Sequence, residues 1–217
     1  MSFNGYIAVE GPIGVGKTAL AERIARHIGG KVVYELAEDN PFLPEFYRHP
    51  AGAAFQTQIF FLMSRYAQLR QLANRDLFSG AIVSDYLFAK DRIFAGINLS
   101  EQEFSLYNRV ASALEAEIAR PDLVVYLTAA VDSLAERIKK RGRNFEKGMD
   151  HRYLESICES YSDFFFHYDE TPLLVVKTDG IDFARDGENF SYLLEKIMSR
   201  PKSAEYISFD RLGFEEI

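Results

Sequence analysis

The sequence has one cysteine, no tryptophan, no long apolar run and an excess of acidic over basic side chains. Cys158 is alone, so no disulfide can form within the chain, and a reducing cytoplasm fits best. The net charge of −7 argues against a general nucleic-acid-binding surface. The most apolar window, around Ile59–Met63, is too short to span a membrane, and the first residues do not resemble a signal peptide. We therefore expect a cytoplasmic protein with no nucleic-acid or membrane partner.

Short apolar segments alternate with longer amphipathic ones along the chain. The expected strands are Tyr6–Glu10, Lys31–Glu35, Ala81–Ser84, Leu123–Leu127 and Leu173–Lys177. The expected helices are Lys17–Ile28, Ala53–Leu77, Glu101–Ala119, Val131–Arg141, Arg152–Tyr168 and Glu188–Ser199. This order predicts an α/β fold with a five-stranded parallel sheet flanked by helices, in one domain over residues 1–200. The tail, residues 201–217, has no clear period, and its role stays open.

A glycine-rich turn joins the first strand to the first helix. It matches G-x-x-x-x-G-K-[ST], the pattern of a P-loop. Glycine lets an anion approach the backbone N–H groups, and the start of the helix adds the positive end of its dipole. A turn without a ligand is the alternative, which the flanking strand and helix disfavour. The pattern predicts that ATP is bound by Gly11, Pro12, Ile13, Gly14, Val15, Gly16, Lys17 and Thr18.

Lys17 is expected to reach the β- and γ-phosphates and to act in catalysis, while the Thr18 hydroxyl binds Mg²⁺. The third predicted strand ends at Asp85, where a parallel sheet would deliver an acid to the same ion. We therefore predict Thr18 and Asp85 as the metal ligands. An acid that merely ends a strand is the alternative reading of Asp85.

Other motifs limit the class of P-loop protein. The N-K-x-D motif of GTPases is absent, and the one D-x-x-G, at residues 210–213, lies in the tail. A compact kinase remains, which needs cations that close over the transferring phosphoryl group. Segment 137–147, RIKKRGRNFEK, offers Arg137, Arg141 and Arg143 for an arginine-rich lid over about residues 137–150. A solvated basic helix end is the alternative.

From about Tyr6 to Ser199 the chain resembles the deoxynucleoside kinase family, which phosphorylates deoxynucleosides at the 5′-hydroxyl. The motifs that carry this resemblance, in order, are GPIGVGKT, Glu35, NPFLPEFY, the pair Phe55-Gln56, DRIFA at Asp91–Ala95, PDLVVYL at Pro121–Leu127, RIKKRGRNFE at Arg137–Glu146, and Asp182-Phe183. The resemblance implies ATP and Mg²⁺ as cofactors, a deoxynucleoside as substrate, and a homodimer.

The resemblance also implies roles for individual residues. Glu35 would orient the 5′-hydroxyl and accept its proton, and Arg141 and Arg143 would contact the transferring phosphoryl group. Arg137, Asp182 and Phe183 would lie beside ATP. The implied deoxynucleoside site consists of Glu35, Tyr47, Phe55, Gln56, Met63, Asp85, Asp91 and Glu146. Phe88 is a further candidate to flank the base, although core packing explains Phe55 and Phe88 equally well.

Two departures from the family pattern bear on substrate choice. Most members follow the acid at Asp85 with arginine, whereas this chain has Tyr86, so that Arg92 or a lid arginine would have to substitute. Met63 stands seven residues after Gln56, where some members carry a base-reading arginine. Asp91 would accept from an amine or from guanine N1–H but not from thymine O4. We therefore expect a purine deoxynucleoside, with deoxyadenosine ranked above deoxyguanosine.

Three functions stay open from the sequence. The first is a deoxynucleoside kinase. The second is a kinase of the same fold that accepts a nucleoside monophosphate or another small hydroxyl compound. Tyr86, in place of the usual arginine, is the reason to retain this alternative. The third is a nucleotide-binding subunit without catalysis.

Overall fold

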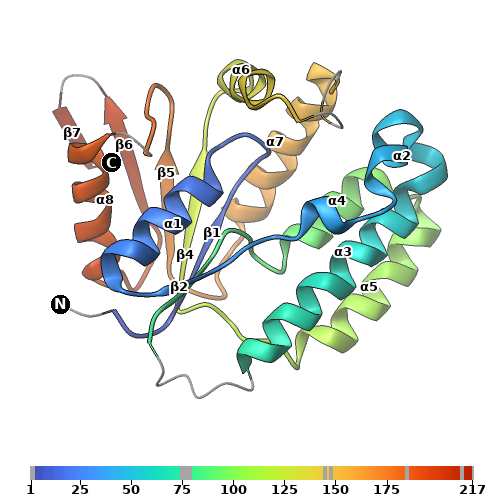
Figure 1. Cartoon of the computed structure of the whole chain (residues 1–217), viewed down its shortest axis with the longest axis horizontal. Coiled ribbons are helices and arrows are strands. Elements are labelled where there is room, and N and C mark those ends of the chain that lie inside the picture. Colours follow the sequence, from blue (N-terminus) through green and yellow to red (C-terminus); the bar gives the residue numbers. More distant parts are fainter. Residues whose placement is uncertain are drawn as a thin grey trace.

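The backbone forms one mixed sheet whose strands are not in sequence order (Figure 1). The computed structural model describes residues 3–73, 80–143, 146, 149–183, 186–210 and 213–216. From edge to edge the strands are β2 (Lys31–Val33), β3 (Ile82–Ser84), β1 (Tyr6–Glu10), β4 (Leu123–Thr128), β5 (Leu173–Lys177), β6 (Glu205–Asp210) and β7 (Gly213–Glu216). All neighbours from β2 to β6 pair in parallel, and β7 pairs antiparallel with β6.

Helices cover both faces of this sheet (Figure 1). They are α1 (Lys17–Ile28), α2 (Leu43–Arg48), α3 (Pro50–Ala73), α4 (Lys90–Asn98), α5 (Glu101–Glu115), α6 (Val131–Arg141), α7 (His151–Phe166) and α8 (Gly187–Met198), with a short 3₁₀ turn, η1, at Ala37–Asp39. None of the helices in the described part of the chain is both long and apolar enough to cross a membrane.

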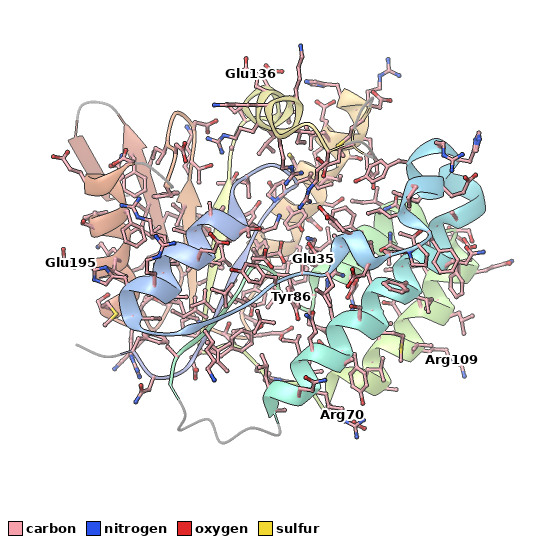
Figure 2. All side chains as sticks on the ribbon, in the orientation of Figure 1. Glu35, Arg70, Tyr86, Arg109, Glu136 and Glu195 are labelled. Atoms are coloured by element: carbon pink, nitrogen blue, oxygen red, sulfur yellow. The ribbon has the colours of Figure 1, made fainter. Side chains whose placement is uncertain are left out.

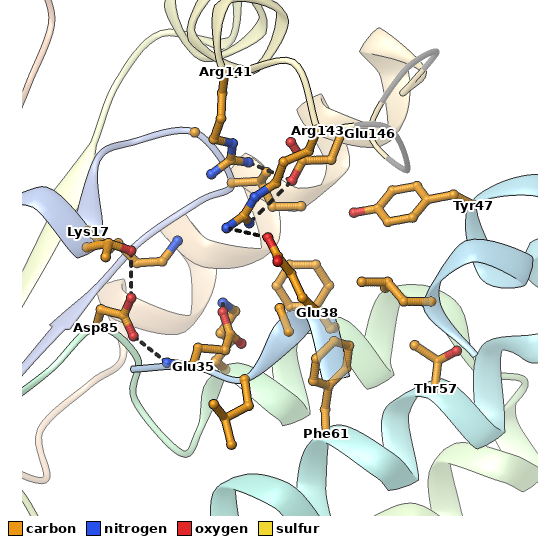
Figure 3. A pocket seen from close by; sticks show the side chains of 18 of the residues that line it. Lys17, Glu35, Glu38, Tyr47, Thr57, Phe61, Asp85, Arg141, Arg143 and Glu146 are labelled. Carbon is orange, nitrogen blue, oxygen red and sulfur yellow. Dashed lines mark hydrogen bonds and ion pairs between the residues drawn. The ribbon is translucent and has the colours of Figure 1, made fainter. Parts of the chain in front are cut away.

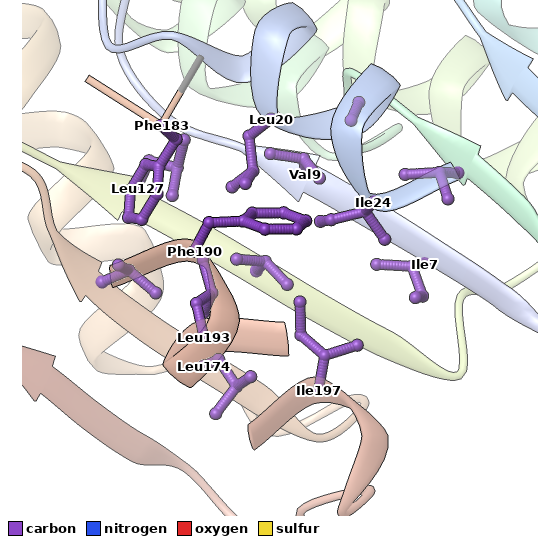
Figure 4. Packing of buried hydrophobic residues seen from close by; sticks show 14 of the residues in the cluster. Ile7, Val9, Leu20, Ile24, Leu127, Leu174, Phe183, Phe190, Leu193 and Ile197 are labelled. Atoms are coloured by element: carbon purple, nitrogen blue, oxygen red, sulfur yellow. The ribbon is translucent and has the colours of Figure 1, made fainter. Parts of the chain in front are cut away.

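Strand β1 shows why a central strand of this sheet consists of consecutive apolar residues. Its residues Ile7 and Val9 pack into a cluster with α1 and α8, and Tyr6 and Ala8 pack into a second cluster with α3, α4, α5 and α7. Figure 4 shows the first cluster, in which Phe190 of α8 lies beside Ile24 of α1. Because both faces are buried, the strand has no polar alternation from Tyr6 to Val9, and the buried carboxylate of Glu10 at its end is satisfied by hydrogen bonds.

The predicted strands and helices are present, and the tail adds to them. The sheet has more strands than the five that we expected. Strands β6 and β7, which lie in the tail where the sequence shows no clear hydrophobic period, extend it to seven strands. Within β6, Ile207 is buried and the neighbouring Tyr206 is 53% exposed, the alternation of a strand with one buried face and one exposed face. The short helices α2 and α4 were not expected, and residues 74–77 of the predicted long helix lie outside the described residues.

Phe190 provides a test of this packing. Its side chain is 4% exposed, in contact with α1 and the sheet, and the Arg23 guanidinium lies 4.0 Å from its ring centroid. We expect Phe190→Ala to lower the free energy of unfolding by about 3–5 kcal/mol, because it leaves a cavity in the core. The matched control Phe166→Ala, at a ring that is 79% exposed, should change it by less than about 0.5 kcal/mol. Urea unfolding measures both, and equal losses would contradict the assigned packing.

Candidate active site

A pocket of about 590 Å³ opens at the carboxyl ends of β1, β2 and β3. Parallel sheets place ligand sites at this edge, because the loops that follow the strands converge there. Figure 3 shows Lys17 and Asp85 at one side of the pocket, the lid arginines Arg141 and Arg143 above it, and Tyr47 opposite. Glu35 lies between them, near the centre of the molecule (Figure 2).

The phosphate loop follows β1 in a conformation that requires glycine. At Gly11 the φ angle is +150°, and an added Cβ would lie 2.3 Å from the carbonyl oxygen of Leu127. Gly16, with φ of +103°, turns the chain into α1, whose first residue is Lys17. Gly14, Gly16 and Lys17 line the pocket at the positive end of this helix, a position that favours a phosphate group.

Lys17 reaches back over this loop. Its ammonium group donates to the carbonyl oxygens of Gly11 and Pro12 at 2.8 and 3.0 Å. Burial, together with the nearby charge of Lys90, lowers the pKa of Lys17 to about 8. A triphosphate in the pocket would reverse this effect, because a bound anion favours the charged amine.

Asp85 joins the phosphate loop to the acid across the pocket. One carboxylate oxygen accepts from the Thr18 hydroxyl at 2.6 Å, and the other accepts from the backbone N–H of Glu35 at 2.7 Å. A hydroxyl and a carboxylate at this distance fit the oxygen ligands that Mg²⁺ takes. Among the described residues no group of three or more acidic, histidine or cysteine side chains could hold a metal, so phosphate oxygens and water would supply the remaining ligands.

Cations surround the Glu35 carboxylate. One oxygen contacts the Arg65 guanidinium, and the other accepts from the Lys90 ammonium group at 2.7 Å. Burial alone would raise the pKa of Glu35, but the charges of Lys90, Arg65 and Lys17 outweigh burial and hold that pKa well below its ordinary value. The carboxylate is thus ionised and fixed in direction. Its lowered pKa makes it a weak base, which suits a group that orients a hydroxyl for a loose transition state more than one that removes the proton early.

The lid arginines reach the pocket from α6 and from the segment after it. Arg141 pairs with Glu146 at 2.6 Å, and Arg143 lies 3.4 Å from Glu38. Arg137 also lines the pocket, and it donates to the carbonyl oxygens of Thr178 and Ile181 at 2.6 and 3.1 Å, so it ties α6 to the loop after β5. Residues 144, 145, 147 and 148 of the predicted lid lie outside the described residues.

The far end of the pocket corrects our placement of the base-reading residues. Gln56 is exposed, Met63 is 46% exposed, and neither lines the pocket, whereas Gln58 and Arg65 do. Two residues along a helix rotate the side chain by about 200°, so an assignment shifted by two positions selects the wrong face. Arg65 is the residue seven positions after Gln58, and its guanidinium also contacts Asp91.

The remaining predicted residues divide into two groups. Tyr47 and Glu146 line the pocket with Ile13, Gly14 and Gly16. Those that do not line it are Gly11, Pro12, Val15, Phe55, Phe88, Asp91, Asp182 and Phe183. Phe183 is a correction, because its ring is 6% exposed and packs in the core against Phe209 instead of facing the pocket. Asp91 lies just behind the lining, where it holds Arg65.

Sequence reasoning missed Lys90, Gln58 and Arg65. Gln58 and Arg65 share a helix face with Leu62 and Leu69, at steps of four, three and four, which is a signal that the sequence does carry. Lys90 has no comparable signature. It stands at the start of a helix that we did not expect, and only the structure reveals that its side chain is buried beside Glu35.

Comparisons with known proteins agree with this site. The family model described as "Deoxynucleoside kinase" matches residues 7–200. The chain is 35% identical over 190 residues to the deoxyguanosine kinase of Bacillus subtilis, an alignment that covers 85% of this chain and 92% of that protein. It is 28% identical to the deoxyadenosine kinase of Lactobacillus acidophilus, over 88% of this chain and 94% of the other.

A solved structure supports the same conclusion. The deoxyadenosine kinase of M. mycoides with bound dATP superposes with a TM-score of 0.76 at 25% identity, covering 90% of this chain and 99% of that one. Both the sequence match and the fold therefore extend over nearly the whole protein. The chain belongs to the deoxynucleoside kinase family and is an ATP-dependent phosphotransferase.

Proposed function

We propose that the protein transfers the γ-phosphoryl group of ATP to the 5′-hydroxyl of a purine deoxynucleoside, and that deoxyguanosine is its preferred substrate. The observation that carries the proposal is Glu35, an ionised carboxylate in one pocket with the phosphate loop and held by Arg65 and Lys90. A hydroxyl placed between Glu35 and the loop would be both oriented and deprotonated.

Each residue has a defined task in this reaction. The 5′-oxygen forms a bond to the γ-phosphorus, the bond from that phosphorus to the bridging oxygen of ADP breaks, and the hydroxyl proton passes to Glu35. Thr18 and Asp85 would hold Mg²⁺, which neutralises charge on the phosphate oxygens. Lys17, Arg141 and Arg143 add positive charge around the transferring group. Tyr47 and Glu146, which line the pocket, would bind the sugar.

The base end of the pocket supports a purine. The Asp91 Oδ2 and Arg65 Nε atoms are buried, and neither has a hydrogen-bond partner among the described residues. An acceptor next to donors suits guanine, whose O6 accepts while N1–H donates, and it also suits the amino group and ring nitrogen of adenine.

The ranking of the two purines changes with the structure. Our preference for deoxyadenosine was made with Met63 in the position of the base-reading arginine. Arg65 now occupies that part of the pocket. Among the relatives, the deoxyguanosine kinase of Bacillus subtilis is 35% identical to this chain, and two deoxyadenosine kinases are 33% and 28% identical, so sequence identity favours deoxyguanosine only slightly. Deoxyguanosine is therefore the better choice.

A homodimer in the cytoplasm completes the proposal. The family resemblance implies the dimer, and two exposed apolar side chains are consistent with a partner. These are Met63 on α3 and Leu106 on α5, which are 46% and 50% exposed on helices that contact each other.

Replacing the acid tests the reaction itself. We expect Glu35→Gln to lower kcat for deoxyguanosine by about 10²–10⁴-fold, because the amide cannot accept the hydroxyl proton. Binding of ATP, measured by calorimetry, should be retained. The control Glu136→Gln, on the outside of α6 (Figure 2), should leave kcat unchanged. A Glu35→Gln enzyme with normal kcat would remove Glu35 from its assigned role.

Two neighbouring glutamines test how α3 reads the base. We expect Gln58→Ala to raise KM for the purine deoxynucleoside by about tenfold, the effect of losing a buried hydrogen-bonding group. Gln56→Ala, the same change on the exposed face, should alter KM by less than about twofold. Steady-state kinetics on a panel of deoxynucleosides and nucleoside monophosphates supplies the values. The opposite pattern would restore Gln56 to the site, and phosphorylation of a monophosphate alone would contradict the proposed acceptor.

The pKa of Lys17 predicts a proton linked to ATP binding. Since that pKa is lowered to about 8 in the empty pocket by burial and by Lys90, much of Lys17 is neutral at about pH 9. ATP favours the charged amine, so binding at about pH 9 should take up a proton, and affinity should fall as pH rises through 8. Calorimetry in two buffers of different ionisation enthalpy measures the uptake. Lys17→Arg, which stays charged, should abolish it; equal uptake by this variant would assign the proton elsewhere.

A further inference from the structure

Lys90 is a buried cation in the pocket that the sequence did not suggest. It is the first residue of α4, its side chain is 7% exposed, and its ammonium group lies 2.7 Å from an oxygen of Glu35. It also lines the pocket with Lys17 and Asp85. Burying an amine is costly unless an anion compensates for the lost water, so its position calls for an explanation.

Tyr86 does not provide the cation that is usual next to the acid at Asp85. Its side chain is buried, and its hydroxyl donates to the Gln68 side chain at 2.9 Å. Segment 85–98 contains two basic residues, Lys90 and Arg92. Arg92 is 43% exposed and lies 3.4 Å from Glu115 on the surface, which excludes it as the substitute that we had considered. Lys90 is therefore the basic residue of this segment that faces the pocket.

The surroundings of Lys90 fit a role in the transfer. Glu35 is held independently by Arg65, which is itself fixed by Asp91. An ammonium group has three donors, so Lys90 can keep its contact with Glu35 and still donate to a second oxygen. Lys90 and Lys17 both line the pocket, so the two amines act on one region of it. A phosphoryl group passing from the loop to a hydroxyl at Glu35 would come between them.

We propose that Lys90 is a catalytic residue that donates a hydrogen bond to the transferring phosphoryl group and so supplies the positive charge absent at Tyr86. The inference rests on the proposed function. As the 5′-oxygen binds the γ-phosphorus and ADP leaves, negative charge spreads over the phosphoryl oxygens, and Lys90 stabilises it from the acceptor side. The hydroxyl proton still goes to Glu35, and Lys90 transfers no proton in this step.

The test separates this role from simple charge balance at Glu35. We expect Lys90→Met to lower kcat by about 10²–10³-fold, as does removal of a donor to a developing oxyanion, with KM for both substrates within about threefold. Lys90→Arg should recover at least about a tenth of the rate. Lys90→Met should also bind ADP with aluminium fluoride, a mimic of the transferring group, far more weakly than the wild type while binding ADP alone equally well. Arg92→Met, the matched control on the same helix, should behave as the wild type.

Each outcome bears on a definite claim. If the wild type phosphorylates no deoxynucleoside, the proposed function fails and the role of Lys90 fails with it. If the wild type is active and Lys90→Met keeps its kcat, or loses ADP and its fluoride complex in equal proportion, only the inference about Lys90 is overturned. Should Lys90→Met fail to fold, as judged by circular dichroism, Lys90→Gln replaces it, because the amide keeps a donor for Glu35 without the charge. The same expected losses then decide the question.

Discussion

The Asp85 carboxylate connects the phosphate loop to Glu35 across the pocket. It accepts from the Thr18 hydroxyl at the start of α1 and from the backbone of Glu35 after β2. These residues come from three strands that are adjacent in the sheet but distant in sequence. A shift in the pairing of β3 with either neighbour would separate the phosphate loop from the acid that faces it. The parallel register of β1, β2 and β3 is therefore the constraint on which the geometry of the pocket depends.

A second buried carboxylate strengthens the same connection. Glu10, the last residue of β1, is fully buried and accepts from the backbone N–H groups of Gly11 and Leu87 at 2.7 and 2.6 Å. It also accepts from the Tyr161 hydroxyl of α7 at 3.0 Å. Charge-assisted hydrogen bonds of this kind are stronger than neutral ones, which compensates for burying the carboxylate. The start of the phosphate loop and the segment that leads to Lys90 are thus fixed to one group, so their separation is set by the core.

The sequence predicted what local chemistry determines. The phosphate loop and the strands before and after it could be located because a turn that admits phosphate needs glycine and a buried parallel strand needs apolar side chains. Glu35 was singled out only by the resemblance to the family. The same reasoning did not locate the glutamine amide that would contact the base. Gln56 and Gln58 are near neighbours on α3, and the choice between them depends on which face of the helix meets the pocket. That choice is made by tertiary packing, of which Leu62 and Leu69 were the available signs.

Lys90 and β6 are two further features that could not be predicted from the sequence. A lysine at the start of a helix is ordinarily exposed, and nothing in the residues around it signals that its amine is buried. Strand β6 pairs with β5, and Ile207 is its one buried residue among residues 205–209, whose burial is described. The run of buried apolar residues was therefore too short to distinguish a strand from a loop in the sequence. In both cases the decisive information is a distant partner, Glu35 for the amine and β5 for the strand.

Ion pairs explain how several charged side chains can lie together in the pocket before a substrate binds. Glu35 is held by Arg65 and Lys90, Arg141 by Glu146, and Arg65 also by Asp91, so these three cations have anionic partners in the resting protein. Lys17 instead donates to two carbonyl oxygens. A triphosphate adds negative charge that competes for those cations. In the proposed reaction Glu35 would keep two cations of its own, so it would stay ionised if the arginines turned to the phosphates, and the acceptor hydroxyl would meet a carboxylate that is already oriented. The ion pairs of the empty pocket thus prepare the charged state that catalysis needs.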